Sequence, residues 1–319
     1  MKDVAVAAGV SLGTVSKVFN GIPVGAEYKN KVDAAAKMLG YQVNEYARGL
    51  RASKTNTIAV IVPNVIHPFY STLADMCCNK LSEKGYRMLL ATTSFDPQTE
   101  QQCIDMVQQN KVDGIIAITY NPELDVKEDI PFVIIDRKFH HRVPCVSSDN
   151  YAGGQLAAEK LVEKGCSNLL FLGISSHVPG EADKRNLGFA SYCQTNNIKH
   201  TIHRVWDEDG FDDIKAFIDS SIKNGKFAYD GIFVSTDMLA IQVMDYLKKH
   251  DISIPEDVQV IGFDGIPKFG FDGYYCSTIK QPLDKMAATA IDILLNQEIN
   301  STPSLVCLPV EYCEGDTTK

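Results

Sequence analysis

Five residues near the N-terminus, GVSLG from Gly9 to Gly13, match the G-x-S-x-G pattern that surrounds the nucleophilic serine of many hydrolases. That serine attacks an acyl group from a tight turn between a strand and a helix. Only eight residues precede Gly9, and they lack a strand pattern. The alternative is that Ser11 begins a helix as its N-cap, because a serine hydroxyl accepts a hydrogen bond from an exposed helix amide. The sequence favours the cap over the nucleophile.

A second set of candidate residues follows the apolar, strand-like runs of the larger part of the chain. Ligands of open α/β sheets bind beyond the carboxyl ends of the strands, so these residues are expected to meet in one cleft. Carboxylates, guanidinium groups and an amide hydrogen-bond to neighbouring hydroxyl groups, and an aromatic face covers the C–H side of a sugar ring. The pattern therefore predicts a polyol ligand, bound by Phe69, Tyr70, Asp136, Arg137, Arg185, Thr236, Asp237, Asp264 and Gln281.

Some of these side chains also have a purely structural interpretation. The sequence favours Asp237 as the cap of the helix that follows it, and Asp136 or Asp264 could cap loops. Arg185 is the strongest ligand-binding candidate. The single tryptophan, Trp206, ends the strand-like run TIHRVW, where it could contact a ligand or simply pack against the protein.

The residues around Ser11 need helices to position them, and residues 1–43 have the pattern of three short ones. Val15, Val18 and Phe19 fall at i, i+3 and i+4, which makes one apolar stripe after the cap. A third helix is expected over 27–39, ended by Gly40, with Tyr28, Val32, Ala35, Ala36 and Leu39 on one face. A helix-turn-helix presents the start of its second helix to base edges. DNA contacts are therefore predicted for Ser11, Leu12, Gly13, Thr14, Ser16, Lys17 and Asn20.

Charge is spread unevenly along the chain. The net charge is −9, yet residues 1–56 hold eight Lys and Arg against four Asp and Glu, which leaves +4 there and −13 elsewhere. A basic head on an acidic body is expected when only the head meets a polyanion such as DNA. Chance remains the alternative explanation, because +4 over 56 residues is modest.

The composition is that of an ordinary globular protein, with 319 residues of which 45% are hydrophobic. The sequence contains neither a run long enough to span a membrane nor a signal-peptide pattern, so a cytoplasmic location without membrane contact is predicted. Its nine cysteines show no paired C-x-x-C spacing and are expected to be reduced and mostly buried. Dinucleotide, Walker A and metal-ligand patterns are likewise missing. No enzyme activity, cofactor or metal is therefore predicted.

Residues 57–319 alternate short apolar runs, such as TIAVIVP, VDGIIAIT and GIFVS, with stretches of helical period. Apolar strands between helices are typical of buried parallel sheets, so the fold class is α/β. About 260 residues of this pattern exceed one typical domain. Two similar lobes joined by a cleft are therefore expected.

The stretch KDVAVAAGVSLGTVSKVFNG resembles the N-terminal signature of the LacI/GalR family of bacterial repressors. The resemblance extends through GYQVNEYARGLRASKTNTIAVIVPN, PFVIIDR, SSDNYAGGQLAAEKL, STDMLAIQVM, IPEDVQVIGFDG and STIKQPLDKMA, and so covers essentially the whole chain. It implies a helix-turn-helix domain over 1–43, a hinge over 44–56, and an effector-binding and dimerisation domain over 57–319. The last would have the fold of periplasmic sugar-binding proteins, with one lobe over about 57–148 and 283–308 and the other over about 149–280 and 309–319.

The resemblance also assigns roles to the hinge. In that family a short hinge helix folds on operator DNA within a dimer, and residues 44–53 match it. Leu50 then corresponds to the leucine that wedges into the minor groove, with Asn44 and Arg48 beside it. A helix-core role is the alternative for Leu50. Val43 departs from the family pattern, which usually has proline before the asparagine.

Finally, the resemblance implies a sugar as effector. Asp136, Arg137, Arg185, Asp264 and Gln281 fall where ribose-type binding proteins hold their ligand, whereas Thr236 stands where several of them have asparagine. The expected protein is a homodimeric repressor that binds operator DNA and responds to a small sugar such as a pentose. A sugar-binding protein of a transport system and a regulator controlled by a partner protein are the alternatives.

Overall fold

The chain divides after Thr55 into two units, Met1–Thr55 and Asn56–Lys319. They are seen in a computed structural model, which describes residues 1–41, 54–126, 130–137, 143–206, 210–296 and 304–319. Residues 44–53 of the predicted hinge, which include Asn44, Arg48 and Leu50, lie outside the described residues, so their predicted roles stay predictions.

The N-terminal unit contains three helices, α1 (Lys2–Ala8), α2 (Leu12–Phe19) and α3 (Ala26–Met38). Helix α1 ends at Gly9, whose φ of +63° is a conformation that glycine adopts without strain. Val4, Val15 and Val32, one from each helix, are fully buried together. Because each helix is too short to persist alone, this shared core is what holds all three.

The third helix runs one residue earlier than predicted, and its inner face is narrower. Val32 and Ala35 are buried, but Tyr28 and Leu39, which the sequence places on the same face, are 52% and 45% exposed. Helix α3 packs against only two other short helices, so the shared core of this unit covers the middle of α3 and not its ends.

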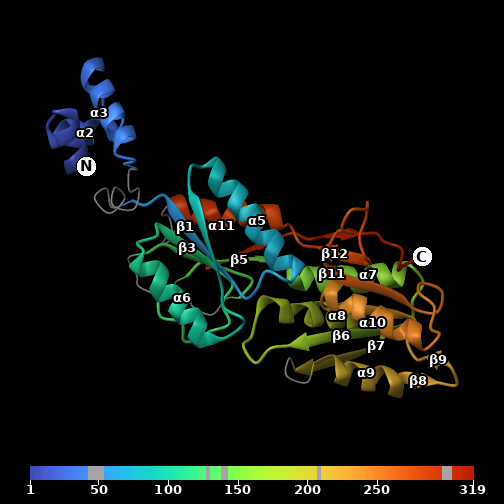
Figure 1. The fold of residues 1–319 in the computed structure, drawn as a ribbon. Coiled ribbons are helices and arrows are strands. Elements are labelled where there is room, and N and C mark those ends of the chain that lie inside the picture. Colours follow the sequence, from blue (N-terminus) through green and yellow to red (C-terminus); the bar gives the residue numbers. More distant parts are fainter. Residues whose placement is uncertain (42–53, 127–129, 138–142, 207–209, 297–303) are drawn as a thin grey trace. The chain divides into compact units, whose positions relative to one another are not determined.

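The first lobe of the larger unit is built on a parallel sheet of six strands in the order β13-β5-β4-β3-β1-β2. The strands are β1 (Thr57–Val62), β2 (Arg87–Thr92), β3 (Gly114–Ala117), β4 (Phe132–Ile135), β5 (Cys145–Ser148) and β13 (Leu305–Leu308). Helices α5 (Pro68–Glu83) and α11 (Leu283–Asn296) pack on one face and α6 (Pro97–Gln109) on the other, as Figure 1 shows.

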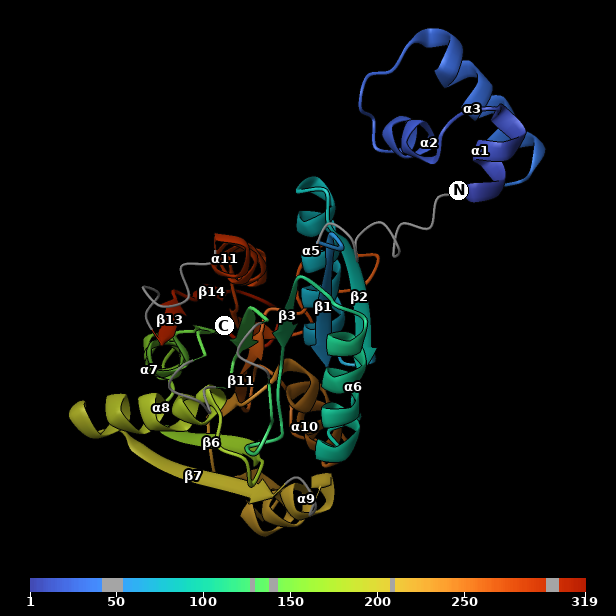
Figure 2. The same cartoon turned by 90° about the vertical axis from the view of Figure 1, so that its left-hand side faces the viewer.

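The second lobe repeats this plan with the strand order β14-β12-β11-β10-β6-β7, in which only β14 is antiparallel. Its strands are β6 (Asn168–Ser175), β7 (Lys199–Trp206), β10 (Gly231–Val234), β11 (Gln259–Asp264), β12 (Ser277–Lys280) and β14 (Glu311–Cys313). Helices α7 (Asn150–Glu163) and α8 (Lys184–Thr195) cover one face, and α9 (Gly210–Ser221) and α10 (Asp237–Lys249) the other (Figure 2). A short 3-10 helix, η1 (Glu181–Asp183), and a hairpin of β8 (Ile222–Lys223) and β9 (Lys226–Phe227) complete it.

The α/β fold class is confirmed, including the parallel sheets and their helical cover. The chain passes between the two sheets after β5, after β12 and after β13, so the same edge of each sheet is joined to the other lobe. Strand β5, of sequence CVSS, was not predicted because half of it is polar, although all four residues are buried. In the part of the chain that the structure describes, no helix is both long and apolar enough to cross a membrane.

Candidate functional site

Ser11 is the N-cap of α2, as predicted. Its hydroxyl oxygen accepts a hydrogen bond from the Thr14 amide at 3.1 Å and lies 2.9 Å from the Thr14 hydroxyl. A serine tied into a helix start in this way satisfies an otherwise unpaired amide, which is the structural role expected of a cap.

The start of α2 presents an exposed surface. Leu12 is 46% exposed, Gly13 and Lys17 are also exposed, and Ser16 is half-buried and accepts a hydrogen bond from the Asn20 amide at 3.3 Å. The opposite side of α2 carries the buried Val15. Ser11, Leu12, Gly13, Lys17 and Asn20 are therefore accessible at the surface of this unit, whereas Thr14 and Ser16 are half-buried.

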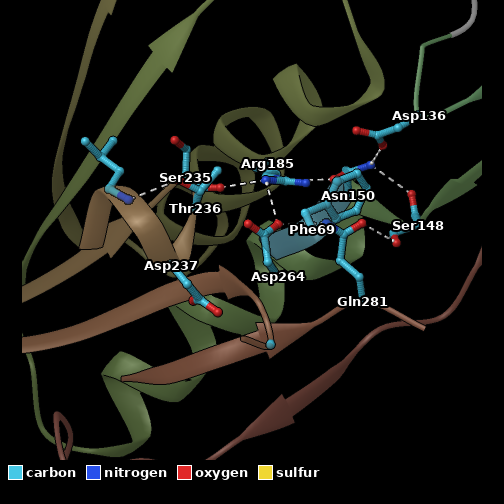
Figure 3. Close-up of polar contacts among 12 residues, drawn as sticks. Phe69, Asp136, Ser148, Asn150, Arg185, Ser235, Thr236, Asp237, Asp264 and Gln281 are labelled. Atoms are coloured by element: carbon cyan, nitrogen blue, oxygen red, sulfur yellow. Dashed lines mark hydrogen bonds and ion pairs between the residues drawn. The ribbon is translucent and has the colours of Figure 1, made fainter. Parts of the chain in front are cut away.

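Arg185, near the start of α8, is the centre of a buried polar cluster in the larger unit. Only 3% of the residue is exposed, and its guanidinium carbon lies 3.6 Å from the centre of the Phe263 ring. Its Nε donates to Oδ1 of Asn150 at 2.7 Å, and its Nη1 donates to the carbonyl oxygen of Ser235 at 2.6 Å. Figure 3 shows Arg185 between these two partners, with Asp264 beside it.

Asp264 ends strand β11 and is buried beside Arg185. Its Oδ1 accepts from Nε2 of Gln281 at 2.8 Å and lies 3.8 Å from Nη1 of Arg185, which is too far for a hydrogen bond. Among the described residues, none donates a hydrogen bond to Oδ2. Burial raises the pKa of Asp264 well above its usual range, and the Arg185 guanidinium opposes that shift only in part.

The backbone of Asp264 is also unusual, because its φ is +124°. Residues other than glycine rarely adopt this conformation, and strain of this kind gathers at ligand-binding sites. A buried carboxylate oxygen without a donor costs free energy as well. Both features mark Asp264 as a candidate ligand-binding residue.

The cluster joins the two lobes. Gln281, after β12, accepts from the hydroxyl of Ser148, the last residue of β5 in the other sheet, at 2.7 Å. Asn150 donates to Oδ1 of Asp136 at 3.3 Å, and Ser147 donates to the same oxygen at 3.0 Å. Polar groups at the carboxyl ends of both sheets thus meet, as the rule for α/β sheets predicts.

Aromatic residues flank this cluster on the first lobe. Phe69 is 7% exposed at the start of α5, and the hydroxyl of its neighbour Tyr70 lies 3.1 Å from that of Tyr120. Phe95 packs edge-on against Tyr120, with ring centres 4.8 Å apart. His67 caps α5 through Nδ1, and burial together with the Arg185 charge lowers its pKa. The imidazole is therefore a neutral acceptor rather than a cation.

Arg137 occupies a different position from the other predicted site residues. Its guanidinium carbon lies 3.6 Å from the centre of the Tyr120 ring, and its Nη1 donates to the carbonyl oxygen of Val178 in the second lobe. The structure thus places Arg137 between Tyr120 and the loop after β6, not in the hydrogen-bonded set around Arg185.

The predicted cap of the helix after β10 is corrected by one residue. The N-cap of α10 is Thr236, whose hydroxyl accepts from the Leu239 amide at 3.3 Å, so Asp237 is not the cap. The Asp237 carboxylate instead accepts from the Ile266 amide at 2.7 Å and from the Thr278 hydroxyl at 2.7 Å. In Figure 3 its carboxylate points away from Arg185, and its two hydrogen bonds join the segment after β11 to strand β12. Neither side chain belongs to the polar cluster.

Five residues of the site were not predicted, namely His67, Phe95, Tyr120, Ser148 and Asn150. Phe95 and Tyr120 follow β2 and β3, so the same strand-end rule applied to those two runs finds them. Ser148 and Asn150 lie around the end of β5, which was itself not recognised as a strand. The described residues include no group of three His, Cys, Asp or Glu side chains arranged to hold a metal ion.

Comparison with known proteins follows the same division of the chain. Residues 1–44 match the bacterial regulatory proteins of the lacI family, and residues 158–318 match the periplasmic binding protein-like domain. A sucrose operon repressor of Streptococcus mutans is 34% identical over 322 residues, 99% of this chain and 98% of the relative. A ribose operon repressor of Bacillus subtilis is 31% identical over 100% of this chain and 98% of the relative.

Solved structures agree with these sequence matches. A periplasmic binding protein/LacI transcriptional regulator from Alkaliphilus metalliredigens, complexed with D-xylulofuranose, is 29% identical with a TM-score of 0.69. It covers 83% of this chain and 99% of its own. The Lac repressor bound to ONPG is 22% identical with a TM-score of 0.81 over 99% of this chain and 98% of its own, which shows the fold alone. On the combined match of a full-length repressor sequence, a DNA-binding head and a two-lobed body, the chain belongs to the lacI family of bacterial regulatory proteins.

Proposed function

We propose that the protein is a transcriptional repressor whose affinity for operator DNA is controlled by a neutral sugar bound at the Arg185–Asp264 cluster. The observation that carries this proposal is the buried Oδ2 of Asp264, which no described residue satisfies. The hydroxyl group of a sugar can donate a hydrogen bond to such an oxygen. The names of the sucrose and ribose operon repressors support the same class of effector.

The charges around the cluster favour a neutral ligand over a sugar phosphate. Arg185 already donates to Asn150 and Ser235, and Arg137 donates to Val178, so both guanidinium groups have acceptors within the protein. A phosphate would in addition place negative charge in a buried site that already disfavours it, because burial raises the pKa of Asp264 there.

Because the cluster is buried, a sugar must enter while the two lobes are apart and then hold them together. The bound sugar would shift the population of the two arrangements, and a coupling of about 1–3 kcal/mol between sugar and DNA sites is typical of such systems. We propose that the protein acts as a homodimer, because paired heads are required to bind a two-fold symmetric operator. We also propose that it acts in the cytoplasm, where its operator DNA lies, and that it has no enzymatic activity. The hinge residues Asn44, Arg48 and Leu50 would contact the same DNA.

A thermal-shift series tests the ligand class directly, because a ligand that binds only the folded state raises the unfolding temperature. D-ribose, D-xylulose, sucrose and cellobiose are compared with ribose 5-phosphate and glucose 6-phosphate at equal concentration. Stabilisation by one or more neutral sugars, with none from either phosphate, is the expected result. Stabilisation by a phosphate alone contradicts the proposal.

A regulator controlled by a partner protein is disfavoured by the helices α5 and α11. Recognition of an acidic or phosphorylated partner requires unpaired basic groups. Lys80 and Lys84 of α5 instead form ion pairs with Asp284 and Asp292 of α11, at 2.7 and 3.0 Å. Their positive charge is therefore balanced within the chain.

A further inference from the structure

A chain of contacts runs from a buried carboxyl group in the first lobe to a loop of the second lobe. It begins at Glu100 of α6, which is fully buried and accepts a hydrogen bond from the Tyr120 amide at 3.0 Å. The Thr119 hydroxyl accepts from the Asn121 amide at 3.1 Å and closes a tight turn around Tyr120. These contacts fix the backbone that carries the Tyr120 ring.

The Tyr120 ring is held on three sides. Its hydroxyl lies 3.1 Å from that of Tyr70, its edge meets Phe95, and its face lies 3.6 Å from the guanidinium carbon of Arg137. Ser94 and Phe95 have φ values of +53° and +63°, so the backbone adopts two successive conformations that residues other than glycine rarely adopt. Such strain persists only where surrounding contacts enforce it.

Arg137 is the point at which this arrangement reaches the second lobe. Its Nη1 donates to the Val178 carbonyl oxygen, and the neighbouring Asp136 carbonyl accepts from the Glu181 amide at 3.1 Å. Val178 lies in residues 176–180, the loop between β6 and η1. A planar guanidinium stacked on a ring keeps a fixed direction, and so loses little freedom when it donates to a single carbonyl.

We propose that Tyr120 positions Arg137 as a latch between the lobes, and that this latch, rather than a hydrogen bond from Arg137 to the ligand, sets how long a bound sugar is retained. Glu100 acts behind Tyr120 as the residue that fixes its backbone. The consequence for sugar binding rests on the proposed function, whereas the contact between the lobes can be tested without any ligand.

A natural tryptophan can report on the contact between Arg137 and the second lobe in the absence of ligand. Trp206, the single tryptophan, stacks on His177 with ring centres 4.4 Å apart and planes within 16°. His177 immediately precedes Val178, the residue that Arg137 contacts. Tryptophan fluorescence and its quenching by acrylamide therefore report whether residues 176–180 are held in place.

The ligand-free experiment compares four full-length variants with the parent protein. Tyr120→Leu removes the ring, Tyr120→Phe keeps the ring but removes the hydroxyl, and Arg137→Met keeps the length of the side chain but removes the donor. Tyr275→Leu, at a residue that is 42% exposed, is the matched control. Tyr120→Leu and Arg137→Met are expected to shift the emission of Trp206 to longer wavelength and to raise its acrylamide quenching. Tyr120→Phe and Tyr275→Leu are expected to match the parent.

Two outcomes overturn the latch. One is a Trp206 signal in Arg137→Met that equals that of the parent. The other is a change in Tyr120→Phe as large as that in Tyr120→Leu, which would mean that stacking on Arg137 is not what matters. If Tyr120→Leu fails to fold, as judged by circular dichroism, the pair Arg137→Met and Tyr120→Phe decides the question alone.

Stopped-flow binding with D-ribose and sucrose tests the consequence for retention. Loss of the latch is expected to raise the sugar dissociation rate about tenfold in Arg137→Met, from the loss of one hydrogen bond and one cation–π contact, with the association rate unchanged. An unchanged dissociation rate, or a fall in the association rate alone, overturns the proposed retention role. If the parent protein binds neither sugar, the choice of these effectors fails, and the fluorescence result still decides the latch.

Discussion

A β-carbon placed on Gly154 of α7 would lie 2.0 Å from the carbonyl oxygen of Arg185 in α8. The relationship is mutual, because a β-carbon on Gly188 of α8 would lie 1.9 Å from the carbonyl oxygen of Tyr151 in α7. Two glycines thus let the helix backbones touch. That contact brings Asn150 and Arg185 within their 2.7 Å hydrogen bond, so the polar cluster depends on two residues that have no side chain.

Gly154→Ala is therefore expected to destabilise the larger unit and to weaken sugar binding together. A methyl group cannot fit against a backbone carbonyl, so α8 must move, at a cost of about 1–3 kcal/mol for overpacking. Urea unfolding and calorimetry measure the two effects. Gly13→Ala is the control, because a β-carbon there meets only the Ser11 hydroxyl at 3.7 Å. Parent-like stability of Gly154→Ala would show that the helices separate without penalty.

Arg185→Lys is expected to reduce sugar affinity by at least about tenfold while operator affinity without sugar stays unchanged. Lysine keeps the charge but lacks the planar, forked geometry that donates to Asn150 and Ser235 at once. Isothermal calorimetry with the stabilising sugar and a DNA titration measure the two properties separately. Unchanged sugar affinity would remove Arg185 from the binding site.

Asp264→Asn is expected to change how the stability of the sugar-free protein depends on pH. Burial raises the folded-state pKa of Asp264 above its unfolded value of about 3.9, so the folded protein holds this proton more tightly. Its contribution to stability is fully present below pH 4 and is lost as pH rises through the folded-state pKa, by at most about 1.4 kcal/mol per pH unit.

The measurement is the difference in free energy of unfolding between parent and Asp264→Asn at pH 5 and at pH 8. The parent should lose stability relative to the variant at the higher pH, and the variant should bind sugar poorly at both. A constant difference between the two pH values would show that Asp264 is charged in the folded protein throughout.

Much of the site was predictable because strand ends are easy to find. Arg185, Asp264 and Gln281 follow apolar runs of the sequence, and the structure brings all three together. The predicted cap role of Asp237 was wrong by one position, since Thr236 and Asp237 are both good helix caps and only tertiary contacts decide between them.

Other parts of the site depend on contacts between distant segments, which a single sequence does not reveal. Ser148 meets Gln281 across 133 positions of the chain, and Arg137 meets Val178 across 41. Strand β5 was not predicted because half of it is polar, and the partners of its two serines, Asp136 and Gln281, come from other segments of the chain.

Ser11→Ala is expected to destabilise the start of α2 by about 1 kcal/mol and to weaken operator binding. Ser11→Asn keeps the cap, so it should retain most of the stability of the helix start and most of the operator affinity. The Thr14 amide, which donates to Ser11 Oγ, should lose protection from hydrogen exchange only in the alanine variant. Equal protection in both variants would contradict the cap. Retention of all these properties in Ser11→Asn also separates a cap from a nucleophile, since asparagine cannot replace a catalytic serine.

If the protein is a sugar-controlled repressor, sugar binding at the Arg185–Asp264 cluster changes the affinity of the α2 surface for DNA. A DNA duplex selected from a random pool by the full-length protein is labelled, and its fluorescence anisotropy is titrated with protein, with and without the stabilising sugar. At a sugar concentration near the dissociation constant of the parent protein, the expected result is a change in DNA affinity for the parent, within the range of about 5- to 150-fold at saturation, and a much smaller change for Arg185→Lys. A parent protein that selects no duplex at low salt, or whose DNA affinity is unchanged by a sugar that it demonstrably binds, would contradict this coupling.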